Sequence, residues 1–217
     1  MRRAVAMLGV ACWCAVVPVL AADLDARLLQ ATPSRTGGLV VCRLQTSGLP
    51  GAKQLQSMRS GLISAVELQM ALIGENDEIL AGRSISLRMG FDLWEEVFSV
   101  RADGRERRFN SLSDLQTYLA DLQGLPVAAA SLIDADKRYR LQVGLVVHSI
   151  APDEQRRVED VIAGEQRPRR EGQDQQEASV SMGRLIRMFY KGGGDEQDGQ
   201  ELASAWFVGK ELPDETH

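Results

Sequence analysis

The sequence predicts a mainly β fold with accompanying helices (α+β), either an antiparallel β-sandwich or a curled sheet that carries two helices on one side. Ile85, Leu87 and Met89 alternate with polar or small residues, which is the period of two expected for a strand with one buried face. Residues 139–147 alternate in the same way and predict a central strand. The elements run as several strands, then a helix, a strand and a helix, which differs from the βαβ alternation of a parallel sheet.

Residues 1–21 are typical of a signal peptide. Two arginines precede an apolar run over residues 4–20, and Pro18 lies close to small residues before the expected cleavage after Ala21 or Ala22. About 19 apolar residues would also just span a bilayer, so an uncleaved membrane anchor is the less favoured alternative. We therefore expect an exported protein, with the periplasm as its compartment.

The composition is that of an acidic, soluble domain. Apolar residues make up 44% of the 217-residue chain and charged residues 25%, which is enough for a buried core under a polar surface. The net charge of −5 becomes −7 when residues 1–21 are removed, because that segment contains two arginines and no acids. Such a charge gives no electrostatic attraction to nucleic acid, which we exclude as a partner.

The mature chain is expected to begin with a polar lead-in over residues 22–38, followed by a β-rich domain over residues 39–164. The segment LVVCRLQTSGLP alternates until Gly48 and Pro50 stop it, which predicts a strand, and residues 53–58 fit one helical turn.

The following stretch of the domain, residues 60–80, fits either a helix or a strand. The polar turn GENDE at its end, followed by further alternating residues, favours a meander of strands. Asp103 and Gly104 predict a hairpin turn, with a short strand leading to Phe109.

Two helices are predicted in the second half of the domain. Ser111 is a typical N-cap with Asp114 three residues later, and leucines at helical spacing follow until Gly124 and Pro126 mark the end. The second helix covers residues 151–164, with a proline in its first turn and acids near its N-terminus.

The segment FDLWEEVFSV, residues 91–100, raises the question of catalytic carboxylates. We predict that it is a strand with its acids at the ends or rim. On a strand Asp92 and Glu96 share a face about 13 Å apart, whereas paired glycosidase carboxylates need about 5–9.5 Å. A structural role is therefore favoured over catalysis.

Residues 165–178 are charged and lack large apolar groups, which predicts a flexible linker. Residues 179–217 are predicted to form an amphipathic segment and a mostly solvated tail, whose apolar patch is Trp206-Phe207-Val208. The helical face of the amphipathic segment and its neighbouring basic groups are Met182, Leu185, Ile186, Phe189, Arg184 and Arg187. Residues 180–191 could dock into the groove of a partner or lie weakly on a membrane surface, while packing back onto the sandwich is the favoured interpretation.

Few residues suit catalysis or metal binding. Cys42 is the single cysteine after the signal peptide, so no internal disulfide forms, and a buried free thiol is expected. His148 ends a strand without a recognisable nucleophile motif, so it is expected to be a strand-edge residue. No zinc site is expected, and Asp134 and Asp136 are explained by turn chemistry, so we predict no metal and no cofactor.

The chain resembles a known family in several stretches: FDLWEEVFSV, FNSLSDLQTYLADLQGLPVAAASLI, YRLQVGLVV and a Pro-Asp-Glu helix start. They resemble an exported proteobacterial family of small periplasmic proteins of unknown function, with a β-sandwich domain, sometimes encoded near two-component sensor genes. The resemblance covers residues 39–163, with a looser match in WFVGKELP. Because the family has no established activity, it implies a periplasmic, mainly β protein and assigns no functional residues.

We therefore predict a non-enzymatic periplasmic binding or accessory module that contacts another envelope protein. The alternative is a carrier or sensor that holds an apolar ligand between sheet and helix, in a cavity lined by Trp94, Phe98, Leu115 and Leu119. An enzyme would need a concave site where Asp92, Glu96 or His148 meets another polar side chain. A solid core with an exposed apolar patch would favour the interaction module over the carrier.

Overall fold

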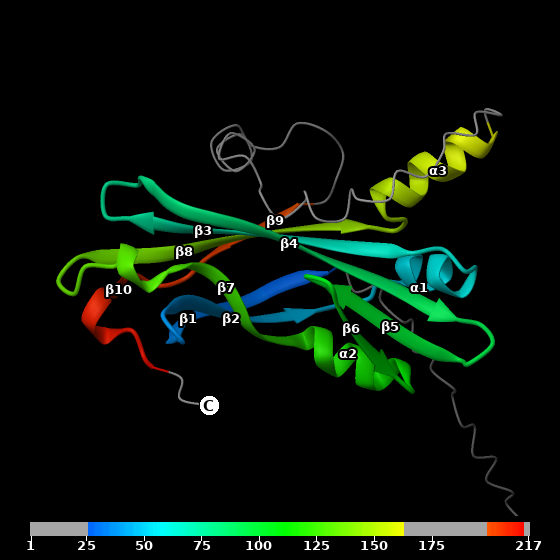
Figure 1. Cartoon of the computed structure of the whole chain (residues 1–217), viewed down its shortest axis with the longest axis horizontal. Helices are drawn as coiled ribbons and strands as arrows, with labels where there is room; N and C mark the ends of the chain where they lie inside the picture. Colours follow the sequence, from blue (N-terminus) through cyan, green and yellow to red (C-terminus); the bar gives the residue numbers. More distant parts are fainter. Residues whose placement is uncertain (1–25, 163–198, 215–217) are drawn as a thin grey trace, which may run out of the picture.

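The chain folds into two antiparallel sheets that lie face to face (Figure 1). The computed structural model describes residues 26–162 and 199–214. The small sheet has the order β1-β2-β7, and the large, seven-stranded sheet has the order β10-β8-β3-β4-β5-β6 with β9 beside β8. The strands are β1 Arg27–Thr36, β2 Leu39–Ser47, β3 Ser64–Gly74, β4 Ile79–Asp92, β5 Val97–Ala102, β6 Arg105–Phe109, β7 Asp121–Ala129, β8 Arg138–His148, β9 Gln200–Ala203 and β10 Phe207–Val208. The predicted mainly β, α+β fold is confirmed.

The hydrophobic core lies between the two sheets. Strand β3 presents Val66, Leu68, Met70 and Leu72 to it, and all four side chains are fully buried. They meet residues such as Leu44 from β2 in the same apolar cluster. Full burial of each such side chain stabilises the fold by about 1.5–3 kcal/mol. Within the ambiguous stretch over residues 60–80, residues 64–74 form β3 at the centre of the large sheet and a turn leads to β4, as the meander interpretation predicted.

Two hairpins turn through pairs of residues with positive φ. Asp103 and Gly104 have φ of 47° and 73° and connect β5 to β6, as predicted. Gly37 and Gly38 have φ of 55° and 79° and connect β1 to β2. Positive φ at both central residues matches the twist of the flanking strands, which is why glycine and aspartate occupy these turns.

The polar lead-in predicted over residues 22–38 is wrong from residue 27 onward, because this segment forms β1. Ala31 is buried opposite Leu44, and Leu28 also packs against the core. A β-bulge between Leu28 and Gln30 breaks the period of two that would mark a strand. The strand is held by its pairing with β2 along its whole length.

The described residues form three α-helices: α1 Ala52–Arg59, α2 Leu112–Ala120 and α3 Pro152–Ile162. Helix α1 extends the single turn predicted at residues 53–58, and α3 starts at the predicted proline. The sequence predicted two helices on one side. In the structure α2 contacts β2, β6 and β7, whereas α3 leaves the end of β8 beside the large sheet (Figure 1), so the helices do not share a side.

Helix α2 begins as predicted but ends earlier. The Ser111 hydroxyl accepts a hydrogen bond from the Asp114 backbone N–H at 3.1 Å, which caps the helix. Leu115 and Leu119 are fully buried in the core. The end predicted near residues 124–126 is wrong, because β7 begins directly after Ala120 and pairs with β2. Leu122 fits both the helical and the strand period, so tertiary pairing decides its conformation.

The C-terminal segment packs on the domain, so the predicted solvated tail is wrong for residues 200–214. Strands β9 and β10 pair with β8, and Leu212 is only 6% exposed within the core cluster. The Arg35 backbone N–H donates to the carbonyl of Pro213 at 2.8 Å, so this segment contacts the small sheet as well. It therefore connects the two layers of the sandwich.

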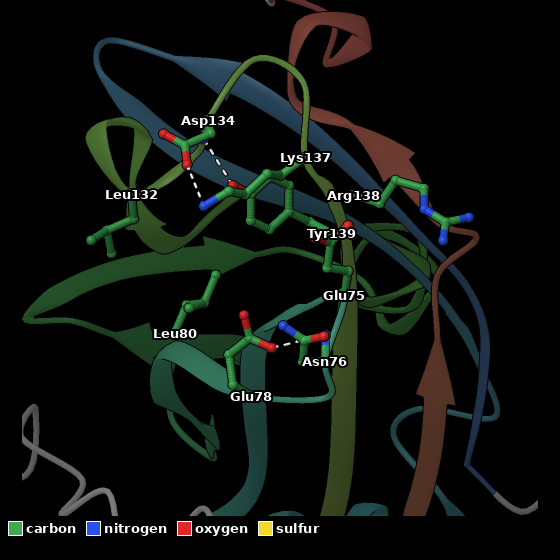
Figure 2. Close-up of a pocket in the computed structure, with 9 residues that line it drawn as sticks. All are labelled: Glu75, Asn76, Glu78, Leu80, Leu132, Asp134, Lys137, Arg138 and Tyr139. Atoms are coloured by element: carbon green, nitrogen blue, oxygen red, sulfur yellow. Dashed lines mark hydrogen bonds and ion pairs between the residues drawn. The ribbon is translucent and has the colours of Figure 1, made fainter.

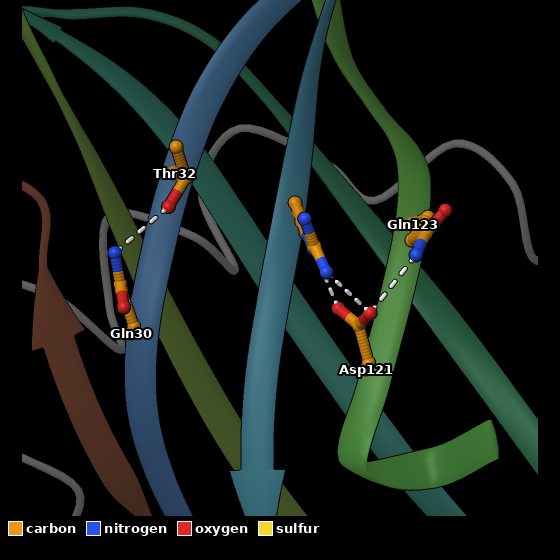
Figure 3. A network of polar contacts seen from close by, with 5 residues as sticks. Gln30, Thr32, Asp121 and Gln123 are labelled. Carbon is orange, nitrogen blue, oxygen red and sulfur yellow. Dashed lines mark hydrogen bonds and ion pairs between the residues drawn. The ribbon is translucent and has the colours of Figure 1, made fainter. Parts of the chain in front are cut away.

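A polar network joins two strands on the surface of the small sheet (Figure 3). Arg43 on β2 donates through Nε and Nη2 to the two carboxylate oxygens of Asp121 on β7, both at 2.7 Å. Gln123 donates to the same carboxylate at 2.9 Å. These hydrogen bonds, above all that of Arg43, lower the pKa of Asp121 from 3.8 to about 2. Because Asp121 is also the C-cap residue of α2, the network fixes the junction between helix and strand.

Several sequence predictions fall on residues outside the described part of the chain. These are the signal peptide over residues 1–21, the linker over residues 165–178 and the amphipathic face that contains Met182, Leu185, Ile186 and Phe189. Within the described part, none of the helices combines the length and the apolar composition needed to cross a bilayer.

We expect Leu212→Ala to lower the free energy of unfolding by about 2–4 kcal/mol, because it leaves a cavity in the core. Urea denaturation followed by circular dichroism measures this change. The matched control is Leu29→Ala on β1, where the side chain is 56% exposed and the change should stay within about 0.5 kcal/mol. Equal effects of the two substitutions would show that the C-terminal segment does not pack as described.

We expect the Arg43–Asp121 contact to make stability depend on pH in the acid range. The pKa of Asp121 is lowered from 3.8 to about 2 in the folded protein. Its contribution is therefore present above pH 4 and is lost as the pH falls through about 2. Because the pair lies on the surface, the contribution is at most about 1 kcal/mol. Urea unfolding at pH 5 and pH 2 should show a larger acid-induced loss for the wild type than for Asp121→Asn, and equal losses would contradict the expectation.

Candidate functional site

Residues 91–100 form a hairpin and not the single strand that the sequence predicted. Phe91 pairs with Phe98 and Asp92 pairs with Val97, so the four residues between β4 and β5 form a turn. We call residues 93–96 the Trp94 turn. Trp94 is 97% exposed and Leu93 is 56% exposed, which places two large apolar side chains together on the surface.

The backbone of the Trp94 turn is held by side chains. Asp92 Oδ1 accepts from the backbone N–H of Trp94 at 2.8 Å and from that of Glu95 at 3.0 Å. The Glu95 N–H, followed by the Trp94 N–H, lowers the pKa of Asp92. This pattern is an Asx turn, which fixes the chain through the aspartate side chain. Arg108 on β6 donates to Glu95 at 2.8 Å and ties the turn to the neighbouring hairpin.

The acids of this segment have structural partners. Asp92 accepts two backbone hydrogen bonds, and Glu95 forms an exposed ion pair with Arg108. Glu96 has a φ of 55° and ends the turn. Asp92 therefore lies at the end of a strand, as predicted, whereas Glu95 and Glu96 lie on the turn. The contacts of Asp92 and Glu95 show that these two acids hold the turn in place.

The four residues proposed to line an apolar ligand cavity do not form one lining, because Trp94 lies apart from the other three. Phe98, Leu115 and Leu119 are buried in the core cluster, where Phe98 packs on Phe91 with ring centroids 4.6 Å apart. Trp94 points into solvent. The region between sheet and helix that was predicted to hold a cavity is thus filled with packed side chains, and the indole of Trp94 is exposed to solvent.

A small polar cavity of about 120 Å³ lies at another end of the sandwich (Figure 2). Its polar groups bond to one another: Lys137 pairs with Asp134 at 2.8 Å, and Tyr139 Oη accepts from the Asp134 N–H. Glu78 accepts from the backbone N–H of Asn76 at 2.9 Å. Ligand pockets for drug-sized molecules start at about 300 Å³ and are mostly apolar. This cavity fits water better than such a ligand.

His148 and Cys42 lie on different sheets. His148 ends β8, as predicted, and its Nε2 lies 3.6 Å from Glu67 Oε1 on β3, beyond hydrogen-bond distance. The sequence did not identify Glu67, because only the pairing of β3 with β8 brings the two together. Cys42 is buried on β2, and burial raises the pKa of its thiol to about 12, so the thiol stays protonated at neutral pH.

Within residues 26–162 and 199–214, no three side chains of histidine, cysteine, aspartate or glutamate gather in a way that could hold a metal ion. Comparison with protein-family models, curated proteins and solved structures finds no match to this chain. The resemblance to an exported periplasmic family stays a prediction. The Trp94 turn is therefore the best-defined candidate site, because it combines exposed apolar area with a fixed backbone.

We expect Asp92→Ala to loosen the Trp94 turn, because it removes both hydrogen bonds to the turn backbone. Time-resolved fluorescence anisotropy in a Trp13→Phe/Trp206→Phe background isolates the Trp94 indole and should report faster local motion. Asp92→Asn is the matched control, since its amide oxygen still accepts hydrogen bonds. Unchanged anisotropy in Asp92→Ala would mean that the side chain does not hold the turn.

Proposed function

We propose that this chain is a non-enzymatic binding or accessory module of the cell envelope that contacts another envelope protein through the Trp94 turn. The observation that carries the proposal is the tryptophan, 97% exposed beside a half-exposed leucine. Burying an aromatic side chain removes about 150–250 Å² from water. Tryptophan anchors of this kind are enriched among residues whose truncation costs about 2 kcal/mol or more of binding energy.

The fixed backbone supports a binding role. The two hydrogen bonds to Asp92 and the Glu95–Arg108 pair restrict the turn before any partner arrives. A surface that is already ordered loses less conformational entropy on association. The turn is thus suited to insert its indole into a pocket as a rigid unit.

The charge around the indole indicates the chemistry of the partner. Glu95 and Glu96 follow Trp94 on a chain with a net charge of −5. Arg108 pairs with Glu95, so Glu96 is the acid beside the indole that has no ion pair among the described residues. An apolar pocket with a basic rim complements this pattern. An anionic membrane surface does not, because it repels the acids beside the indole. A protein with a lysine- or arginine-lined apolar pocket is therefore the proposed partner.

The carrier alternative has less support. The residues that would line its cavity are packed in the core or exposed to solvent. The periplasmic location is part of the proposal and is supported by the signal-peptide pattern of residues 1–21.

The proposal is tested with a photo-crosslinking residue in place of Leu93 in the cells that produce the protein. We expect one discrete adduct that Trp94→Ala reduces at least tenfold, which corresponds to about 1.4 kcal/mol of binding energy. Glu96→Lys should also reduce the adduct, because the new lysine is repelled by the basic rim of the partner's pocket.

The matched control is Trp206→Ala, which removes another partly exposed tryptophan and should leave the adduct unchanged. An adduct that persists in Trp94→Ala, or that responds equally to Trp206→Ala, would exclude the Trp94 turn as the contact surface.

A further inference from the structure

Strand β6 ends the large sheet beside β5 (Figure 1), and its other edge is free within the described part of the chain. Helix α2 contacts β6, but no backbone hydrogen bond joins these two elements. The backbone N–H and C=O groups that point out from such an edge can bind a further extended segment as an added strand. The strand covers Arg105–Phe109, which offers about 17 Å of edge.

The free edge concentrates positive charge on a chain that is acidic as a whole. Three of the five residues of β6 are arginines and one is a glutamate, and these four side chains are exposed. The whole chain, in contrast, has a net charge of −5. Part of the local charge is already balanced, because Arg108 pairs with Glu95 at 2.8 Å and Glu106 pairs with Arg101 at 2.9 Å.

Arg105 and Arg107 have no acidic partner among the described residues. Because side chains alternate along a strand, these two share one face of β6 with Phe109. On that face the Arg107 guanidinium lies over the Tyr118 ring of α2, 5.2 Å from its centroid, and Phe109 packs on the same ring. One face of β6 therefore offers two unbalanced guanidinium groups in line with an aromatic pair.

We propose that the free edge of β6 binds an extended acidic segment of a partner protein as an added strand. The inference rests on the proposed function for the identity of this partner, which is the protein that receives the Trp94 turn. Cross-strand neighbours of opposite charge stabilise a sheet, so acids belong opposite Arg105 and Arg107, and an apolar residue belongs opposite Phe109. The segment therefore has an apolar residue and two acids at alternate positions.

Charge distinguishes this segment from other strands that could use the edge. Charged side chains on an edge strand discourage pairing with neutral or like-charged strands. A second copy of β6 would bring a net positive strand against another, since each copy has three arginines and one glutamate. An acidic strand turns the same charges into an attraction, which gives the edge its specificity.

The free edge and the Trp94 turn are close enough for one partner to contact both. Phe109 at the end of β6 pairs with Phe98, which follows the turn at the start of β5. Arg108 on β6 donates to Glu95 of the turn at 2.8 Å. A strand added to β6 would lie about 10 Å from β5, which is two strand spacings. The acidic segment would therefore run beside the pocket that takes the indole.

Synthetic peptides and the purified chain test the added strand by fluorescence anisotropy. The probe is a labelled peptide, Thr-Val-Thr-Glu-Thr-Glu-Thr, and we expect its affinity to exceed that of the peptide with two lysines in place of the glutamates at least about tenfold. Two further peptides are N-methylated at alternate positions, either on one backbone edge or on the other. Strand addition requires that one of them loses about tenfold in affinity and that the other binds like the unmodified probe.

Charge reversal on the protein locates the binding edge. Arg105→Glu combined with Arg107→Glu should weaken probe binding at least about tenfold. Arg27→Glu combined with Lys53→Glu is the matched control, because it makes the same change in net charge at exposed positions of β1 and α1 and should leave the affinity unchanged. Trp94→Ala should also leave it unchanged, so failure of the Trp94 contact and failure of the added strand are separate results.

Three outcomes would overturn the inference. They are no binding of the acidic probe, equal affinities of the two methylated peptides, and equal losses of affinity in the edge variant and its charge-matched control. The peptide comparisons use the unchanged chain, so they decide the question even where the double charge reversal impairs folding.

Discussion

The central strand β3 has a row of large apolar residues on its inward face, and the need to cover that face organises the rest of the molecule. It pairs with β8 on one edge and β4 on the other, so its backbone hydrogen bonds are satisfied within the sheet. Its inward face, with Leu68 and Met70, needs a second apolar layer, which the small sheet supplies. Its N-terminal end is closed by α1, where Gln54 donates to the carbonyl of Ala65.

The sequence predicts those parts of the fold that are determined by neighbours in the chain. Ser111 caps α2 through an amide three residues away, and Asp103-Gly104 defines its hairpin by local backbone conformation. Strands β1 and β9, by contrast, were not predicted from the local sequence. Strand β1 contains a β-bulge that breaks its alternation, and β9 is a strand because it pairs with β8. Their conformation depends on partners distant in sequence, which periodicity does not reveal.

The Trp94 turn was also not predicted from the sequence, for a different reason. Leu93 and Trp94 continue an apolar pattern, so period and composition both indicate a strand through this segment. Two competing hydrogen bonds to the Asp92 side chain end the strand, and Glu96 adopts a positive φ that a strand does not allow. Asp92 itself is a usable turn signal, because an aspartate side chain can bond the backbone two residues on. The near-complete exposure of the indole has no such signal, because large apolar residues are usually buried.

Of the three acids at the Trp94 turn, two are already bonded, and the apolar surface of the turn is exposed. Asp92 accepts from two backbone amides and Glu95 accepts from Arg108. Among the described residues, Glu96 takes part in no ion pair. The proposed partner therefore needs an apolar pocket for the indole and a basic group for Glu96.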